Sequence, residues 1–141
     1  MRNARSRRGN ALIEFAAALT LLSGIFVGIF QISHMFLTYS KLHNAVRAGA
    51  RYASLRASNS GPADPELERS VANMVIYGDP RPGVDATPLV SGLGDQNVVL
   101  VVGPATATVE LRNFEINALF GKVRLDGRPT VTFPFPNGGG K

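Results

Sequence analysis

The chain has 141 residues, which is room for one small domain, and it contains no cysteine. The missing thiols exclude a disulfide framework, thiolate zinc sites and a cysteine nucleophile. Four of the five excess positive charges are arginines among the first eight residues, which leaves the remainder at +1, so no nucleic-acid partner is expected.

A membrane-spanning helix is the first element that the sequence predicts, over about residues 15–37. No residue between Phe15 and Phe30 is charged, and Gln31 and His34 lie near the far end, where headgroups can solvate them. A spanning helix needs about 20 mostly apolar residues. Because basic residues stay on the cytoplasmic side, the arginines predict a cytoplasmic N-terminus and an exported C-terminus.

Two other interpretations fit this apolar run less well. A helix buried inside a soluble domain of this size would not cover so long an uncharged stretch. A cleaved secretory signal has a shorter apolar region of about 7–15 residues, followed by a small-residue cleavage site. Here the run is longer and helical periodicity continues beyond it, so the segment is interpreted as an anchor.

The helix is predicted to continue in amphipathic form as far as Ser58. No proline interrupts the chain from Met1 to Gly61. Apolar and small residues recur at three- and four-residue spacing, and polar ones lie mostly on the other side. The first set is Leu42, Ala45, Val46, Gly49, Tyr52, Ala53 and Leu55; the second is Lys41, Asn44, Arg47 and Arg51. We expect one continuous helix from about Asn10 to Ser58.

Glu14 is a carboxylate inside the apolar segment. It costs roughly 2.5–3.5 kcal/mol at a helix centre and less near the interface, so alone it could simply snorkel to the surface. Its context is a basic tail, Gly9, Asn10, three residues, then Glu14 and Phe15. This order resembles the class III signal of type IV pilins and their relatives, as in the Flp/Tad branch.

The resemblance implies a removable leader. Gly9 would be its last residue, and a membrane prepilin peptidase would cut there on the cytoplasmic face, leaving Asn10 as an N-methylated first residue. Glu14 would be the fifth residue of the mature chain, with Phe15 beside it. A buried carboxylate needs a partner, and the new amino terminus of an adjacent subunit would serve. Asn10 departs from the Phe or Met of many major pilins.

Two rows of small residues predict close helix packing. Gly24 and Gly28 form a GxxxG within the membrane run, and Ala45, Gly49 and Ala53 repeat the same spacing. In lipid such rows allow helices to approach closely. Packing against other subunits predicts these rows, although GxxxG also arises by chance in glycine-rich apolar helices.

A short helix and a long loop open the exported part. Asp64 as N-cap, Pro65 at the first position and two glutamates in the first turn predict a helix over residues 66–77, ended by Gly78. Residues 78–96 are rich in Pro and Gly and predict a loop.

Strands follow. Residues 97–102 are a continuous apolar run, residues 105–114 alternate, and residues 122–125 and 130–135 flank an Asp126-Gly127 turn that predicts a hairpin. Residues 115–121 fit either a short helix or a connection. We expect an α+β, pilin-like fold: a leader (1–9), a long helix (10–58), and an extracytoplasmic domain (59–141) whose three- or four-stranded antiparallel sheet packs on that helix. The glycines at 138–140 predict a flexible tail.

A narrower resemblance covers most of the chain. The stretches GNALIEFA, AVRAGARYAS and NMVIYGDP, followed by residues 87–90 (TPLV), are similar to the TadE/TadG-like family of minor pilins or pseudopilins of the tight-adherence (Tad) pilus. The family implies a single-pass subunit of the bacterial inner membrane with a periplasmic C-terminus, which can enter an extracellular pilus, with no enzymatic activity and no cofactor. Its implied partners are other pilin and pseudopilin subunits, the prepilin peptidase, the inner-membrane assembly platform and the lipid bilayer.

Candidate metal ligands are weak. His34 and His43 are nine residues apart on one helix, without a cysteine. Asp79, Asp85 and Asp95 lack the DxDxDG spacing of a calcium loop, so turn formation is the main interpretation and weak calcium binding the alternative.

Three classes of function can be weighed. The leading one is a structural subunit of pilus assembly. The alternative is a signal-anchored binding or adhesion module, which would remain active when cut free at about Ser60. A DNA-binding protein would need arginines on a folded face; Arg47, Arg51 and Arg56 form a basic stripe, but a solvated charge run is the commonest explanation.

Overall fold

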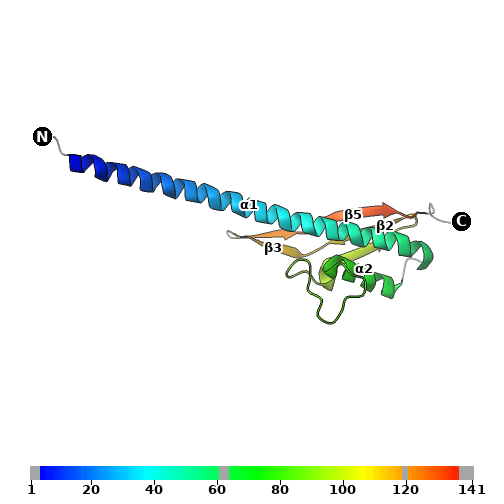
Figure 1. The fold of residues 1–141 in the computed structure, drawn as a ribbon. Helices are drawn as coiled ribbons and strands as arrows, with labels where there is room; N and C mark the ends of the chain where they lie inside the picture. Colours follow the sequence, from blue (N-terminus) through cyan, green and yellow to red (C-terminus); the bar gives the residue numbers. More distant parts are fainter. Residues whose placement is uncertain (1–3, 61–63, 119–120, 137–141) are drawn as a thin grey trace. The chain divides into compact units, whose positions relative to one another are not determined.

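The structure of the chain is a computed structural model that describes residues 4–60, 64–118 and 121–136. Two helices precede five strands in chain order (Figure 1). The chain divides into two compact units, Met1–Phe36 and Leu37–Lys141. The first three residues of the predicted leader and the predicted glycine tail lie outside the described residues.

Helix α1 spans Ala4–Ser60 and therefore starts earlier than the expected Asn10. Alanine and arginine favour helix and no proline intervenes, so the helix extends into the basic segment. Within the apolar stretch, hydroxyls bond back along the helix: Thr20 Oγ1 donates to the carbonyl of Ala16 and Ser23 Oγ to that of Leu19, each at 2.8 Å. These bonds give both hydroxyl groups an acceptor within the helix, so neither group needs a water molecule inside the apolar stretch.

Helix α2 spans Pro65–Tyr77 and is capped as the sequence predicts. The Asp64 carboxylate accepts from the Glu66 N–H at 2.9 Å, and Pro65 occupies the first turn, where a missing N–H costs nothing. At the other end Gly78 adopts φ 78°, and its N–H donates to the Met74 carbonyl at 3.1 Å. Glycine takes this left-handed conformation without a Cβ clash, so the predicted stop is confirmed.

The larger sheet has three antiparallel strands in the order β1-β2-β5: β1 is Val98–Val102, β2 is Thr106–Leu111 and β5 is Thr130–Pro134. Strand β2 alternates as predicted, with Ala107, Val109 and Leu111 buried and the residues between them half-exposed. A single-turn 3-10 helix, η1 (Asp95–Asn97), leads into β1. The long loop before it runs without other regular structure, also as predicted.

A second, two-stranded sheet corrects two predictions. The described residues of the segment 115–121, which are 115–118 and 121, form neither a helix nor a simple connection, because β3 (Phe114–Ala118) pairs with β4 (Gly121–Leu125). Consequently β4 does not form a hairpin with β5 across Asp126-Gly127; β5 pairs with β2 instead. The physical reasons are local: Asn113 at φ 52° turns the chain out of the first sheet, and the connection from Leu125 to Thr130 is longer than a two-residue turn.

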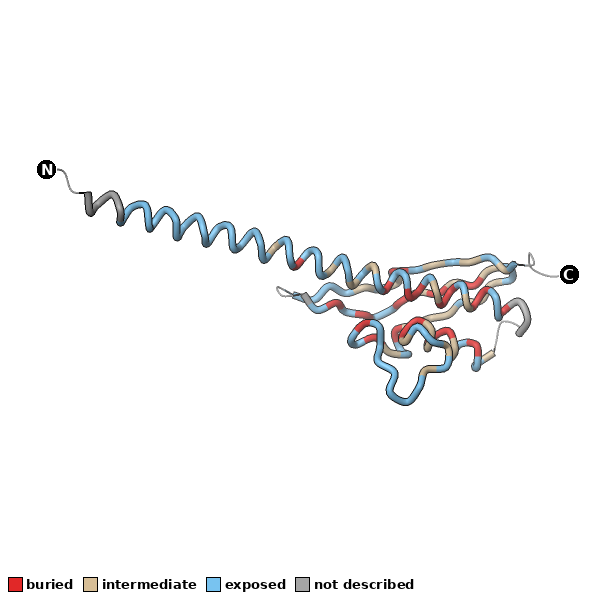
Figure 2. Tube along the Cα trace, viewed as in Figure 1, coloured by how far each residue is buried: buried red, intermediate tan, exposed pale blue. Residues whose placement is uncertain are grey.

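One hydrophobic core joins the second half of α1, α2 and the inner face of the larger sheet within the second unit (Figure 2). Within the second unit, the buried α1 residues recur at three- and four-residue spacing: Leu42, Ala45, Val46, Gly49, Ala50, Ala53, Ser54 and Ala57. Two expected members differ, since Tyr52 is half-buried and Leu55 is 52% exposed. Most residues of this buried stripe of α1 have small side chains, which lets α2 and the sheet approach the α1 backbone closely.

Candidate functional site

The apolar part of α1 exposes many large hydrophobic side chains. Figure 2 shows that most of this part of the helix is coloured as exposed. Leu12, Phe15, Phe26 and Phe36, for example, are each 65–70% exposed. The helix is long and apolar enough to cross a membrane, and none of its most apolar window is buried by the chain itself. A monomeric soluble protein rarely exposes so large a continuous apolar surface, so this surface fits a membrane anchor.

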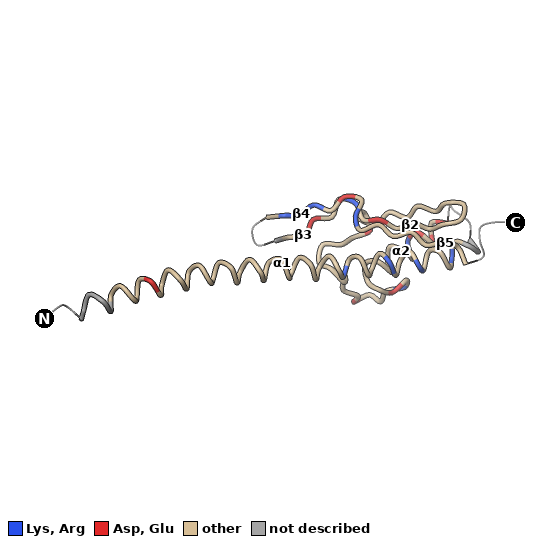
Figure 3. Tube along the Cα trace, turned by 90° about the horizontal axis from the view of Figure 1, so that it is seen from above, with Lys and Arg blue, Asp and Glu red and all other residues tan. Residues whose placement is uncertain are grey.

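Glu14 is the acidic residue of this segment, and Figure 3 shows that charged residues are sparse along the described apolar part of α1. Its side chain is exposed on the helix surface, next to the equally exposed Phe15. Among the described residues, no ion pair involves its carboxylate. An unpaired carboxylate at membrane depth is unfavourable, so a partner for this group must come from outside the described chain or from the membrane surface.

Gly9 and Asn10 lie within α1 and are both exposed. A Cβ atom built on Gly9 would meet nothing within 4 Å, so packing inside the chain does not explain the glycine. The five residues before Gly9 are helical as well, so the Gly9–Asn10 peptide bond lies inside α1.

The two rows of small residues occupy different environments. A Cβ on Gly24 or on Gly28 would find nothing within 4 Å, so both face open space on the apolar half of the helix. Ala45, Gly49 and Ala53 instead lie in the core of the second unit, at 5% exposure or less for the two alanines. Since that second row is already covered by the same chain, only the first row offers surface to another helix.

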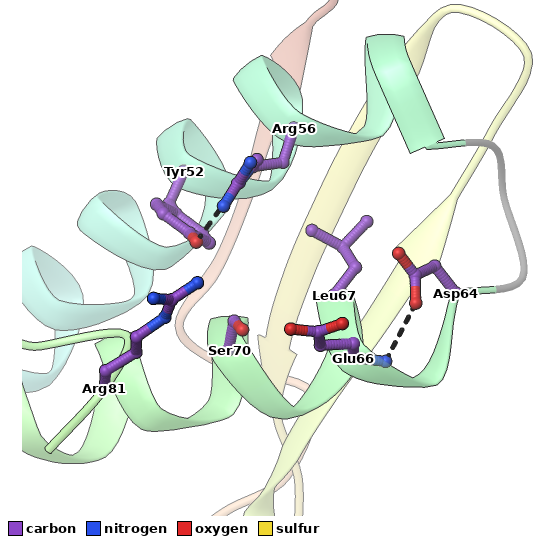
Figure 4. Close-up of a pocket in the computed structure, with 7 residues that line it drawn as sticks. All are labelled: Tyr52, Arg56, Asp64, Glu66, Leu67, Ser70 and Arg81. Carbon is purple, nitrogen blue, oxygen red and sulfur yellow. Dashed lines mark hydrogen bonds between the residues drawn. The ribbon is translucent and has the colours of Figure 1, made fainter.

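A polar depression of about 180 Å³ lies between the end of α1, the start of α2 and the loop after it (Figure 4). Its lining residues are Tyr52, Arg56, Asp64, Glu66, Leu67, Ser70 and Arg81. The Arg56 Nε donates to the Tyr52 hydroxyl at 3.4 Å, and this bond raises the pKa of the Arg56 guanidinium further above its usual range, with smaller help from the Glu66 and Asp64 carboxylates. No sequence motif identifies this depression, because its residues come from three separate segments.

The weak metal candidates are not brought together. His34 and His43 are both exposed on α1, and no group of three or more His, Cys, Asp or Glu residues capable of holding a metal occurs in the part of the chain that the structure describes. The Asp79 carboxylate accepts from the Arg81 N–H at 2.8 Å, which is a turn-forming bond. Asp85 and Asp95 are exposed at separate points of the same loop region.

Comparison with known proteins finds one similarity, which lies within α1. A family model described as TadE-like protein matches residues 9–51, from the glycine before Asn10 to the middle of the buried stripe. No curated protein and no solved structure matches the chain. The matched segment contains both the exposed apolar surface with Glu14 and most of the stripe that carries the second unit. Residues 9–51 of the chain are therefore similar to TadE-like proteins.

Proposed function

We propose that this chain is a minor pilin or pseudopilin that takes part in assembling a Tad (type IVc) pilus and works through its N-terminal helix. The observation that carries the proposal is the exposed apolar surface of residues 12–37 within a TadE-like segment. None of the most apolar 18-residue window of this helix is buried by the chain itself. Such a helix is suited first to a bilayer and then to a bundle of like helices, because both environments cover it on all sides.

In this proposal the chain is a prepilin peptidase substrate. The arginines before Gly9 keep the N-terminus in the cytoplasm, with the C-terminal unit in the periplasm. Cleavage after Gly9 removes these charges and gives Asn10 a new amino group, which is then methylated. The exposure of Gly9 and Asn10, with nothing within 4 Å of a Cβ at Gly9, supports this step. Removal of the basic residues matters physically, since a tail of four arginines would hold the helix in the membrane interface.

Glu14 is then the residue that sets the position of the subunit in the bundle. The amino group of an adjacent subunit is the cation with which its carboxylate pairs, and the low dielectric of a helix bundle makes that attraction strong. Phe15 beside it supplies apolar contact area. Gly24 and Gly28, which face open space, are where a neighbouring helix can approach most closely. Other pilins and pseudopilins, the prepilin peptidase and the assembly platform of the inner membrane are the partners that this role needs.

The alternative is a signal-anchored binding or adhesion module that is never built into a filament. The polar depression around Tyr52 and Arg56 is the feature that favours it, since a cavity lined by both charges suits a small polar ligand. Its simplest form, a domain that survives cleavage at about Ser60, conflicts with the core, because α1 residues from Leu42 to Ala57 are buried among α2 and the sheet. A tether could still be cut nearer Leu37.

Substitution of Glu14 tests the proposal. We expect Glu14→Gln and Glu14→Ala to insert into the membrane as the natural chain does, because each removes a charge from the apolar segment, and to lose co-purification with partner pilins. Glu115→Ala, which removes an exposed carboxylate of β3, is the matched control and should assemble normally. Normal piliation by both Glu14 variants would contradict the role given to this carboxylate. Full binding or adhesion by a chain that does not assemble would favour the alternative.

A further inference from the structure

The part of α1 that belongs to the second unit turns only positive charge outward. Residues 37–60 of this helix contain no aspartate or glutamate and four basic residues, which are Lys41, Arg47, Arg51 and Arg56. All four are exposed, whereas the opposite face of the same segment is the buried stripe. Figure 3 shows basic positions along this part of α1. No acidic neighbour on the helix therefore offsets these charges.

Arg47 and Arg51 lie about one helical turn apart on this exposed side. Side chains at positions i and i+4 are neighbours on a helix surface, and two like charges at that spacing destabilise the helix slightly. The helix dipole offers no compensation, because it acts on the last turn and the last turn of α1 contains no basic residue. The energetics of α1 alone do not account for this pair of arginines, whereas a negatively charged partner outside α1 would offset their repulsion.

The charges of the strand region are paired, and those on the outer side of α1 are not. Within residues 4–60, 64–118 and 121–136, the ion pairs are Glu110–Arg112, Glu115–Lys122 and Glu115–Arg124. Arg56 is a separate case, because it lines the polar depression together with carboxylates of its own chain. The other three cations of this part of α1 are Lys41, Arg47 and Arg51, which we call the basic face. They take part in none of these ion pairs.

An excess of negative charge lies in a different part of the second unit. Residues 64–97, which we call the acidic segment, contain α2, the loop after it and η1. They carry six acidic and two basic residues, a net charge of −4. The carboxylates of Asp64 and Asp79 already cap a helix and close a turn. Glu68 and Asp85 are exposed and take part in no ion pair with the described residues, so the segment has carboxylates available for a cationic partner.

One copy cannot bring its own basic face onto its own acidic segment. The buried stripe of α1 packs against α2 and the sheet, so the basic face on the opposite side points away from both. Figure 1 shows that the loop after α2 projects away from α1 within the second unit. Both surfaces therefore remain open in a single molecule, and contact between them requires two molecules.

We propose that the basic face of one copy docks on the acidic segment of a second copy. Charge complementarity selects this partner, because the same chain supplies a surface of opposite sign that its own fold leaves open. The two surfaces differ, so the contact is heterologous: a pair of copies leaves one basic face and one acidic segment free, and the contact can continue into a row. The inference does not rest on the pilin role, since it uses only residues of the second unit.

Zero-length cross-linking of the full-length chain in membranes tests this contact. A carbodiimide couples a lysine amine to a carboxylate that touches it, and Lys41 supplies the amine of the basic face. In a mixture of unlabelled and isotope-labelled copies, we expect mixed-isotope cross-links from Lys41 to carboxylates of the acidic segment. Their yield should fall several-fold in high salt, because the screening length drops from about 8 Å at physiological ionic strength to about 3 Å at 1 M.

Reversal of two charges on the basic face separates a lost contact from lost reactivity. Arg47→Glu/Arg51→Glu keeps Lys41 and every carboxylate of the acidic segment. We expect its cross-link yield to fall by about tenfold, since two exposed attractions become repulsions. Arg124→Glu/Arg128→Glu changes the net charge equally at two exposed positions outside both surfaces, so it is the matched control and should cross-link normally.

A mixture of two variants shows whether the partner is a second copy. Copies with Arg47→Glu/Arg51→Glu are isotope-labelled, and copies with Glu68→Arg/Asp85→Arg are not. Neither variant should give mixed-isotope cross-links with copies of itself. The mixture should give them from Lys41 of the unlabelled copy to the acidic segment of the labelled copy, because one native surface of each kind is present again. An undiminished cross-link in Arg47→Glu/Arg51→Glu copies alone, or a mixture that gives none, would overturn the proposal.

Discussion

Gly49 of α1 lies so close to Val75 of α2 that a Cβ atom at position 49 would overlap Cγ2 of Val75. The same Cβ would also contact the carbonyl and side chain of Val71, at 3.6 and 3.7 Å. The glycine is therefore required by the approach of α2 and not by the backbone conformation of α1. The contact of Gly49 with α2 packs the segment that matches the TadE-like model (residues 9–51) against the rest of the second unit.

Gly49→Ala is expected to destabilise the second unit by about 1–3 kcal/mol, because the added methyl group forces the two helices apart. Gly28→Ala is the matched control: nothing lies within 4 Å of its Cβ position, and alanine favours helix over glycine by about 0.5–1 kcal/mol. Thermal unfolding of both variants in detergent should show a lowered midpoint for Gly49→Ala only. Equal midpoints would contradict the close helix contact.

The boundary of the folded second unit gives another prediction. A fragment of residues 37–141 retains every buried residue of the core, whereas a fragment of residues 61–141 loses the whole α1 stripe. We expect the first fragment to show a cooperative unfolding transition and the second to show none, since a body of about 80 residues without that stripe has too little core. Cooperative unfolding of the shorter fragment would contradict the shared core.

The Asn97 side chain holds the crossing from β2 to β3. It is 5% exposed; its amide donates to the Arg112 and Asn113 carbonyls at 3.0 Å each, and its oxygen accepts from the Gly94 N–H at 3.2 Å. Asn97→Ala should cost about 1–3 kcal/mol, because buried backbone groups lose their partners. Asn117→Ala, at an exposed position of β3, should change the free energy of unfolding far less. Denaturant titration of both variants measures the difference.

Elements fixed by neighbouring residues could be predicted from the sequence. Asp64 and Gly78 bound α2 because caps act within one turn, and the alternation of β2 follows from its period of two. The pattern around Gly9 and Glu14 is also local and lies within the residues that match the family model, while leader cleavage and the role of Glu14 stay predictions.

The sequence did not predict which distant strands pair with one another. Asp126-Gly127 fits a hairpin, but whether β4 pairs with β3 or with β5 depends on Asn113, which turns the chain between the sheets. The spacing of apolar residues does not reveal such a turn. The depression at Tyr52 and Arg81 joins residues far apart in the sequence and has no motif. On α1, Leu55 fits the apolar spacing, yet the smaller Ala50 and Ala57 are buried, because packing room decides between them.

GxxxG packing in the membrane half gives a further prediction. Gly24→Leu and Gly28→Leu leave the second unit unchanged, because nothing in the chain lies near either Cβ position, but each blocks close approach of a second helix. We expect both variants to insert and to lose association with partner pilins, measured by co-purification. Leu21→Ile, on the same exposed helix, is the control that should associate normally. Undiminished association of both glycine variants would assign the contact to another face.

The mass of the mature chain tests the pilin role most directly. In cells with an active prepilin peptidase, intact-mass measurement of the membrane-bound protein should give a chain that begins at Asn10 and carries one methyl group on its amino terminus. A Gly9→Leu variant should retain Met1, since the peptidase then lacks its glycine. Recovery of the natural chain with Met1 intact in those cells would contradict the account, because Glu14 would have no new amino terminus with which to pair.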